Sequence, residues 1–229
     1  MAEKKSGFMD TRGAFIDAAF ALMSERSFED TSVDVIVARA KLSKGTFFHY
    51  FRTKDALIEA ACERLAQQGW QAVEPTLKGE GSPIEKLAGY LSQGRRFRVK
   101  HAAEVGEVWD GLAKEHNATL RARVSKAYRE LVRPHFRELI AQGAAAGQFQ
   151  VEDAATTTDL LLEFVEASAE GSMRLLRSGS PDAAELASRR VNATMTAVER
   201  ILGVEKGVLL RTCAQTLERF QKPTTEGGA

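Results

Sequence analysis

The basic residues between Arg39 and Lys54 are the part of this sequence whose types and spacing point most directly to a chemistry. Five cationic side chains lie in this stretch without a single acid: Arg39, Lys41, Lys44, Arg52 and Lys54. The whole chain is nearly neutral, with 32 basic and 31 acidic residues, so the excess is local. A local cationic cluster attracts phosphate through counterion release, whatever the base sequence. The stretch therefore indicates a nucleic-acid-binding surface.

Two short helices with a tight turn are predicted to position these cations. The apolar residues of the first helix fall at i, i+3, i+4 and i+7, which gives one buried stripe: Val33, Ile36, Val37 and Ala40. Thr31 is the expected N-cap of this helix, with Asp34 as its capping-box acid. Ser43 is the expected N-cap of a second helix over residues 44–51. Only Lys41 and Leu42 remain for the turn, so residues 31–51 have helix-turn-helix spacing.

The second helix is predicted to face a core on one side and DNA on the other. Phe47 and Phe51, four residues apart, are expected to pack inward against Phe15, Leu22 and Ile36. A purely structural interpretation as an aromatic-rich core helix leaves Lys44, Thr46, His49 and Tyr50 without a role. The residues expected to meet base edges or adjacent phosphates are Lys44, Gly45, Thr46 and His49. Those expected mainly to hold the DNA backbone are Thr31, Ser32, Ser43, Tyr50 and Lys54.

The N-terminal quarter of the sequence resembles a known family. Residues 11–61, TRGAFIDAAFALMSERSFEDTSVDVIVARAKLSKGTFFHYFRTKDALIEAA, are similar to the DNA-binding domain of the TetR/AcrR transcriptional regulators. The opening TR…IxxAAxxLMxERxF, then TSVxxI, SKGTFFHYF and TKDALxxA, occur in the family's order and spacing. The resemblance implies a dimeric, ligand-responsive regulator, usually a repressor, that binds a palindromic operator.

Three positions depart from the family's pattern. Ser27 and Lys41 stand where the family usually has glycine, at a helix end and in the turn. A left-handed conformation without glycine costs about 1 kcal/mol, which affects stability more than function. Phe48, which also belongs to the predicted DNA-binding residues, replaces a usual tyrosine, so the phosphate hydrogen bond that the family makes at this position is expected to be missing.

The remainder of the chain predicts an all-helical protein with two domains. It has five prolines, many alanines and few alternating β-branched runs. We expect a three-helix DNA-binding domain over residues 8–68, with a connecting helix that begins after Thr53 as N-cap. A helical ligand-binding and dimerisation domain is expected over residues 69–229. The segment EPTLKGEGSP, residues 74–83, is the expected break in helical structure.

Two helices of the second domain are predicted to pair two copies of the chain. The first spans about residues 153–177 and has a seam of Leu161, Val165, Ser168, Ser172 and Leu176. The second spans about residues 181–202 and has a seam of Ala187, Val191, Thr194, Val198 and Ile201. The alternative is that both seams belong to the internal core of one chain. The family resemblance implies a four-helix homodimer interface, because reading two half-sites requires two-fold symmetry.

A small, largely apolar effector is the expected ligand of the second domain. The side chains expected to line its cavity, with His101 or Tyr128 as a polar group, are Phe97, His101, Trp109, Tyr128, Phe136, Phe164 and Met173. Taken singly, such residues are more often ordinary core. By resemblance, the effector would favour a separation of the two recognition helices that no longer fits DNA.

Several other classes of function have little support in the sequence. Cys62 and Cys213 are isolated, so we expect no disulfide framework, metal site or cofactor. No apolar run approaches the roughly 18 residues of a membrane span, and we expect a cytoplasmic protein. An enzyme would depend on His101, Glu104 and His116, whose spacing is also that of a solvated face. A ligand-independent dimeric regulator or a protein-interaction module on the same fold is the stronger alternative.

Overall fold

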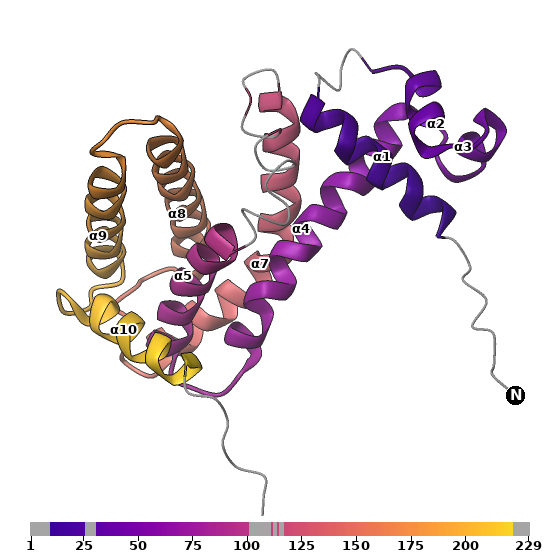
Figure 1. Ribbon diagram of the computed structural model, residues 1–229. Coiled ribbons are helices and arrows are strands. Elements are labelled where there is room, and N and C mark those ends of the chain that lie inside the picture. Colours follow the sequence, from indigo (N-terminus) through magenta and orange to yellow (C-terminus); the bar gives the residue numbers. More distant parts are fainter. Residues whose placement is uncertain (1–9, 26–30, 101–110, 112–113, 115–116, 222–229) are drawn as a thin grey trace, which may run out of the picture. The chain divides into compact units, whose positions relative to one another are not determined.

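The computed structural model describes residues 10–25, 31–100, 111, 114 and 117–221. Within these ranges it contains helices and no strand (Figure 1). The helices are α1 Thr11–Glu25, α2 Val33–Ala40, α3 Lys44–Tyr50, α4 Lys54–Lys78, α5 Pro83–Lys100, α7 Ala118–Ala145, α8 Ala154–Arg177, α9 Ala183–Ile201 and α10 Val208–Gln221. The chain forms two compact units. The first comprises the described parts of Met1–Gln68 and Lys100–Tyr128, and the second those of Gly69–Val99 and Arg129–Ala229.

An aromatic core holds the helices of the first unit together. The ring of Phe15 on α1 meets the ring of Phe47 on α3 edge to face, with centroids 5.4 Å apart. It meets the ring of Phe51 in the same way at 6.2 Å. Leu22 and Ile36 are buried in the same cluster, as the sequence predicted. Phe47 is therefore the residue of α3 that is buried in this core, and the rest of α3 is exposed or half-buried.

The beginning of α7 belongs to the first unit. Leu120 and Val124 are buried in the same core cluster as Phe15. Just before α7, the Asn117 side chain donates to the backbone carbonyls of Met23, at 3.1 Å, and Gly111, at 2.7 Å. Within α7, Arg123 forms an ion pair with Asp55 on α4, at 2.6 Å. Apolar burial and polar contacts therefore both fix the start of α7 in this unit.

Helix α4 continues further than the sequence predicted. Thr53 caps it as expected, since its Oγ1 accepts the backbone N–H of Ala56 at 3.0 Å. The break predicted for residues 74–83 is too early, because α4 runs through Pro75 to Lys78. Burial of Val73, Thr76 and Leu77 holds this last turn in place. A Cβ on Gly79 would lie 2.6 Å from the Pro75 carbonyl oxygen, so Gly79 permits the chain to turn away there.

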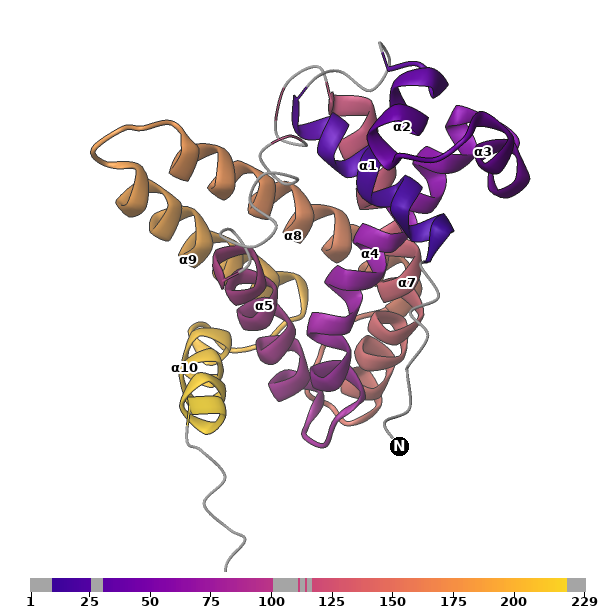
Figure 2. The same ribbon diagram turned by 45° about the vertical axis from the view of Figure 1, so that its right-hand side comes forward.

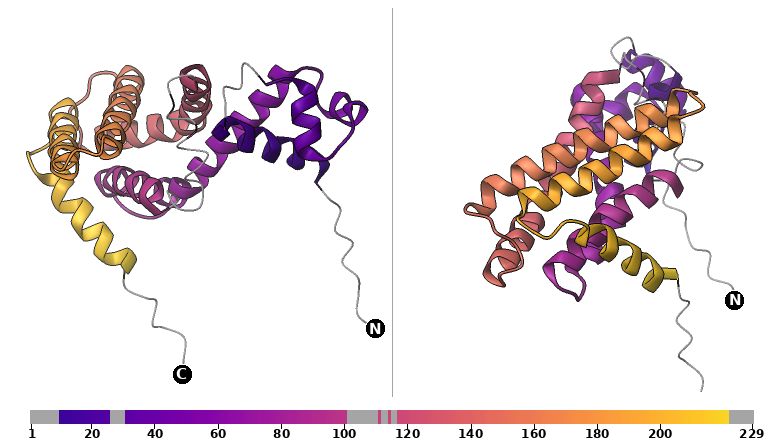
Figure 3. Two further views of the ribbon diagram at one scale, coloured as in Figure 1. Left: turned by 45° about the horizontal axis from the view of Figure 1, so that its top comes forward. Right: turned by 90° about the vertical axis from the view of Figure 1, so that its left-hand side faces the viewer.

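In the second unit, α8 and α9 run side by side in opposite directions (Figure 2 and Figure 3). Ser168 and Thr194, from the two predicted seams, are buried and hydrogen-bonded to each other within one chain. Arg190 donates its Nε–H to the Ser168 carbonyl at 3.2 Å. A Cβ on Gly171 would lie 2.5 Å from the Arg190 guanidinium carbon. Ser168 and Thr194 therefore pack α8 against α9 within one chain, which corrects the expected place of these two residues. Leu176, from the same predicted seam of α8, is 45% exposed, so the predicted dimer interface stays a prediction.

Other apolar side chains of α8 and α9 are exposed. Leu160 and Phe164, four residues apart on α8, share one face of that helix and are 58% and 38% exposed. Leu186 and Ile201 on α9 are 41% and 40% exposed. Apolar residues of this helix pair therefore remain uncovered in one chain, and Ile201 among them belongs to the predicted seam of α9.

A buried carboxylate joins α9 to α10. Glu199 is 1% exposed and accepts the backbone N–H groups of Gly207, at 2.8 Å, and Leu209, at 2.9 Å. Both donors lie at the start of α10, where helical N–H groups have no partner within the helix. Glu199 therefore serves as a side-chain cap for α10.

Candidate nucleic-acid interface

Serine side chains begin both helices of the helix-turn-helix. Ser32 Oγ accepts the N–H of Val35 at 3.3 Å, so Ser32 and not Thr31 is the N-cap of α2. Thr31 is 1% exposed, and its predicted contact with the DNA backbone would have to be made from a buried position. Ser43 Oγ accepts the N–H of Thr46 at 3.0 Å, which confirms the predicted N-cap of α3.

The turn between α2 and α3 requires a left-handed residue. Lys41 has φ 56° and ψ 38°, the conformation that glycine adopts without strain. The N–H of Lys41 donates to Ala38 O at 3.2 Å, and that of Leu42 donates to Val37 O at 3.1 Å. These bonds satisfy carbonyls at the end of α2 and reverse the chain directly into α3. The other departure from glycine, Ser27, lies outside the described residues.

Most of the residues predicted to contact DNA are exposed. Ser32, Ser43, Lys44, Gly45 and His49 are exposed, whereas Thr46 and Lys54 are half-buried. Phe48 and Tyr50 are 49% and 42% exposed. The Thr46 hydroxyl lies 2.7 Å from Ser43 Oγ, so the N-cap also orients the Thr46 side chain.

Two of the five cations are held by carboxylates from outside the basic stretch. Arg39 Nη2 donates to both carboxylate oxygens of Glu25 on α1, at 2.6 and 2.5 Å. Lys44 Nζ lies 2.9 Å from Asp34 Oδ1 on α2. Asp34 therefore pairs with a cation across the turn, and the capping box predicted with Thr31 is wrong. Lys41 and Arg52 are exposed and form no ion pair among the described residues.

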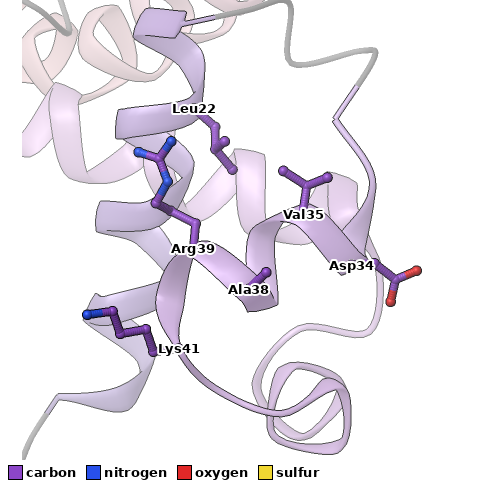
Figure 4. Close-up of a pocket in the computed structure, with 6 residues that line it drawn as sticks. All are labelled: Leu22, Asp34, Val35, Ala38, Arg39 and Lys41. Carbon is purple, nitrogen blue, oxygen red and sulfur yellow. The ribbon is translucent and has the colours of Figure 1, made fainter.

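A surface pocket of about 570 Å³ lies on the same helices (Figure 4). It is lined by Leu22, Asp34, Val35, Ala38, Arg39 and Lys41. Figure 4 shows Leu22 of α1 and Val35 and Ala38 of α2 beside the charged side chains. None of these residues belongs to the predicted effector site, so this pocket is a feature of the candidate DNA-binding unit.

The residues predicted to bind an effector have different surroundings in the structure. Phe136 is 1% exposed, and its ring meets that of Tyr90 with centroids 4.7 Å apart. Phe164 is 38% exposed on α8, while Tyr128 and Met173 are half-buried. His101 and Trp109 lie outside the described residues, as does the side chain of Phe97. The structure therefore describes four of the seven side chains, and the effector site stays a prediction.

Neither a metal cluster nor a membrane helix is present in the part of the chain that the structure describes. No three His, Cys, Asp or Glu side chains gather there as metal ligands would. No described helix is both long and apolar enough to cross a bilayer. His101, Glu104 and His116, the residues considered for catalysis, are outside the described residues.

Comparison with known proteins places the helix-turn-helix in a recognised sequence family. Residues 15–61 match the model of the family described as bacterial regulatory proteins, tetR family. The repressor KstR2 of Mycolicibacterium smegmatis (strain ATCC 700084 / mc(2)155) is 22% identical over 175 residues, which are 76% of this chain and 83% of that protein. The repressor NemR of Escherichia coli (strain K12) is 31% identical over 98 residues, 42% of this chain and 49% of NemR.

Solved structures share the fold over most of the chain. RolR without ligand superimposes with a TM-score of 0.59 at 21% identity, covering 88% of this chain and 96% of RolR. RolR in complex with resorcinol gives a TM-score of 0.57 at 23% identity, covering 94% of this chain and 95% of RolR. The likeness therefore extends beyond the helix-turn-helix into the helices that follow it.

Proposed function

This chain belongs to the TetR/AcrR family of transcriptional regulators, and from that premise we propose that it is a repressor that binds a palindromic operator as a homodimer. The observation that carries the proposal is the exposed, serine-capped face of α3 over an aromatic core. Ser43, Lys44, Gly45 and His49 are exposed there, while Phe47 is buried beneath them. A rigid helix with small and cationic residues at its start can enter a major groove.

Recognition of an operator requires two such helices. One α3 makes few base contacts, and two copies reading successive major grooves must lie about 34–36 Å apart. The exposed apolar residues of α8 and α9, among them Leu160, Phe164 and Leu186, support a dimer formed through this helix pair. The protein then acts in the cytoplasm on chromosomal DNA, and its half-sites are related by the two-fold axis of the dimer.

A small effector is proposed to release the operator. Its site lies in the second unit and includes Phe136 and other residues of the predicted set. RolR has been crystallised with resorcinol, so small aromatic compounds are a suitable first panel. The effector must bind the released state more tightly than the operator-bound state, because only differential affinity shifts the equilibrium between them.

Binding measurements with the protein's own upstream DNA test this function. Fluorescence anisotropy should show tight binding to a near-palindromic duplex and weaker binding to a scrambled duplex of the same length. An effector from the panel should weaken operator binding at concentrations that leave the protein folded. Equal affinity for both duplexes at moderate ionic strength would refute the proposal.

A further inference from the structure

We propose that Asp34 is a specificity-determining residue of the DNA-binding surface, because its ion pair with Lys44 weakens non-specific binding more than operator binding. The inference rests on the proposed function. It assigns a role to an acid that the sequence suggested only as a helix-capping residue. It also explains why an exposed carboxylate lies within a surface that otherwise attracts phosphate.

The pair links the two helices of the helix-turn-helix. Asp34 is in the first turn of α2, and Lys44 is the first residue of α3. Lys44 Nζ lies 2.9 Å from Asp34 Oδ1 and 3.3 Å from Oδ2. The side chains of Lys44 and Asp34 are 56% and 71% exposed, so the pair lies at the solvent-facing surface.

The ion pair itself contributes little to folding. An ion pair this exposed is screened by solvent and adds little to folding stability. The helix starts do not need Asp34 as a cap either, because Ser32 and Ser43 each accept a backbone N–H from their own helix. The pair is therefore not needed as a cap, and it changes the charge of the surface that α2 and α3 present.

Asp34 acts differently on the two kinds of DNA complex. Non-specific binding depends on phosphate contacts, and a carboxylate beside Lys44 both neutralises the ammonium and repels phosphate. Operator binding adds short-range contacts to base edges, where a lysine ammonium donates to guanine O6 or N7. An ammonium has three N–H donors, so Lys44 can keep Asp34 as one partner and still donate to a base. Non-specific binding, which depends on the net charge near the phosphates, is thus weakened more than operator binding, which also has a directional contact to a base.

Asp34→Asn tests the inference because it removes the charge and preserves the size of the side chain. Anisotropy titrations would use the duplex that the wild-type protein selects from a random pool, and a scrambled duplex of the same length, over a salt series. For scrambled DNA we expect affinity to rise roughly fivefold. The salt slope, which is the slope of log K against log[salt], should steepen by about one per chain, as an added phosphate contact requires. Operator affinity should change by less than about twofold, so that the operator-to-scrambled ratio falls.

Two further variants separate this role from a general charge effect. Asp17→Asn removes the same charge from the same unit, where Asp17 forms an ion pair with Arg64 at 3.0 Å and is 63% exposed. Asp17→Asn should leave the ratio of operator affinity to scrambled-duplex affinity unchanged. Asp34→Glu, which keeps the charge, should keep most of the wild-type ratio. Equal changes in Asp17→Asn and Asp34→Asn would overturn the inference, as would an unchanged ratio and slope in Asp34→Asn. A wild-type protein that prefers no duplex would overturn the proposed function, and the inference with it.

Discussion

A Cβ placed on Gly45 would meet no atom nearer than Ser43 Oγ, at 3.8 Å. The start of α3 therefore has room for a methyl group, and the protein's own packing does not require glycine there. Gly45 has no positive φ either, so backbone conformation does not explain the residue. Close approach of another molecule to this part of the backbone remains as the physical reason for a missing side chain.

Gly45→Ala should consequently separate stability from DNA binding. The variant should be as stable as the wild type or more so by about 0.5 kcal/mol, because alanine favours the helix. Operator affinity should fall by about tenfold as the methyl group holds the backbone away from the groove. Urea unfolding and anisotropy measure the two quantities on one preparation. Unchanged affinity would exclude Gly45 from the interface.

Lys54→Ala should weaken binding to every duplex. Lys54 begins α4, and its predicted contact is with phosphate, which carries no sequence information. We expect the operator-to-scrambled ratio to stay constant while the salt slope flattens by about one per chain. Titrations at four or more salt concentrations provide the slope. A variant with the wild-type slope would remove Lys54 from the site.

Lys41→Gly should stabilise the first unit while removing one exposed cation. At φ 56° a non-glycine residue is strained by about 1 kcal/mol, part of which is offset by the greater unfolded-state entropy of glycine. The matched control is Lys41→Ala, which loses the same charge and keeps the strain. Urea unfolding should find Lys41→Gly more stable than Lys41→Ala by roughly 0.5 kcal/mol, the part of the strain that the entropy does not offset. Equal stabilities would show that the turn relaxes without glycine.

Burial of Cys62 should make stability fall at high pH. Burial in the core raises the pKa of the thiol from 9.0 to about 12, with a smaller raising effect from Glu59 and Glu63 and an opposing one from Arg123. The thiol ionises at lower pH in the unfolded chain than in the folded protein. Its contribution to the free energy of unfolding is therefore fully present below pH 9 and is lost as the pH rises towards 12. Unfolding free energies from pH 7 to 10.5 should decline more steeply in the wild type than in Cys62→Ala. Parallel curves would contradict the burial effect.

The sequence predicted those parts of the fold that depend on local pattern. The stripe around Ile36, the inward-facing Phe47 and the caps Ser43 and Thr53 all follow from spacing and residue type, and the structure confirms them. Thr31 was mistaken for the N-cap of α2 because threonine and serine can both cap. Only tertiary packing, which buries Thr31, decides in favour of Ser32.

Interactions between distant segments could not be predicted in the same way. Glu25 lies fourteen residues before Arg39, so a count of charges within 39–54 missed the acid that neutralises it. Ser168 and Thr194 occupy helical seams, but periodicity alone does not say whether a seam meets its own chain or a second copy.

The end of α4 was predicted too early because Pro75 and Gly79 are both helix breakers. Burial of Leu77 outweighs the hydrogen bond that proline removes.

The claim that two copies of α3 lie in the major groove is tested most directly by dimethyl sulfate protection. The experiment uses the operator duplex that the wild-type protein selects from a random pool. Guanine N7 is exposed in that groove, so a bound helix should shield it. The account predicts two protected patches centred about one helical turn apart, related by two-fold symmetry, and abolished with excess unlabelled operator. Uniform reactivity along a duplex that the protein occupies, or protection at a single half-site, would contradict it.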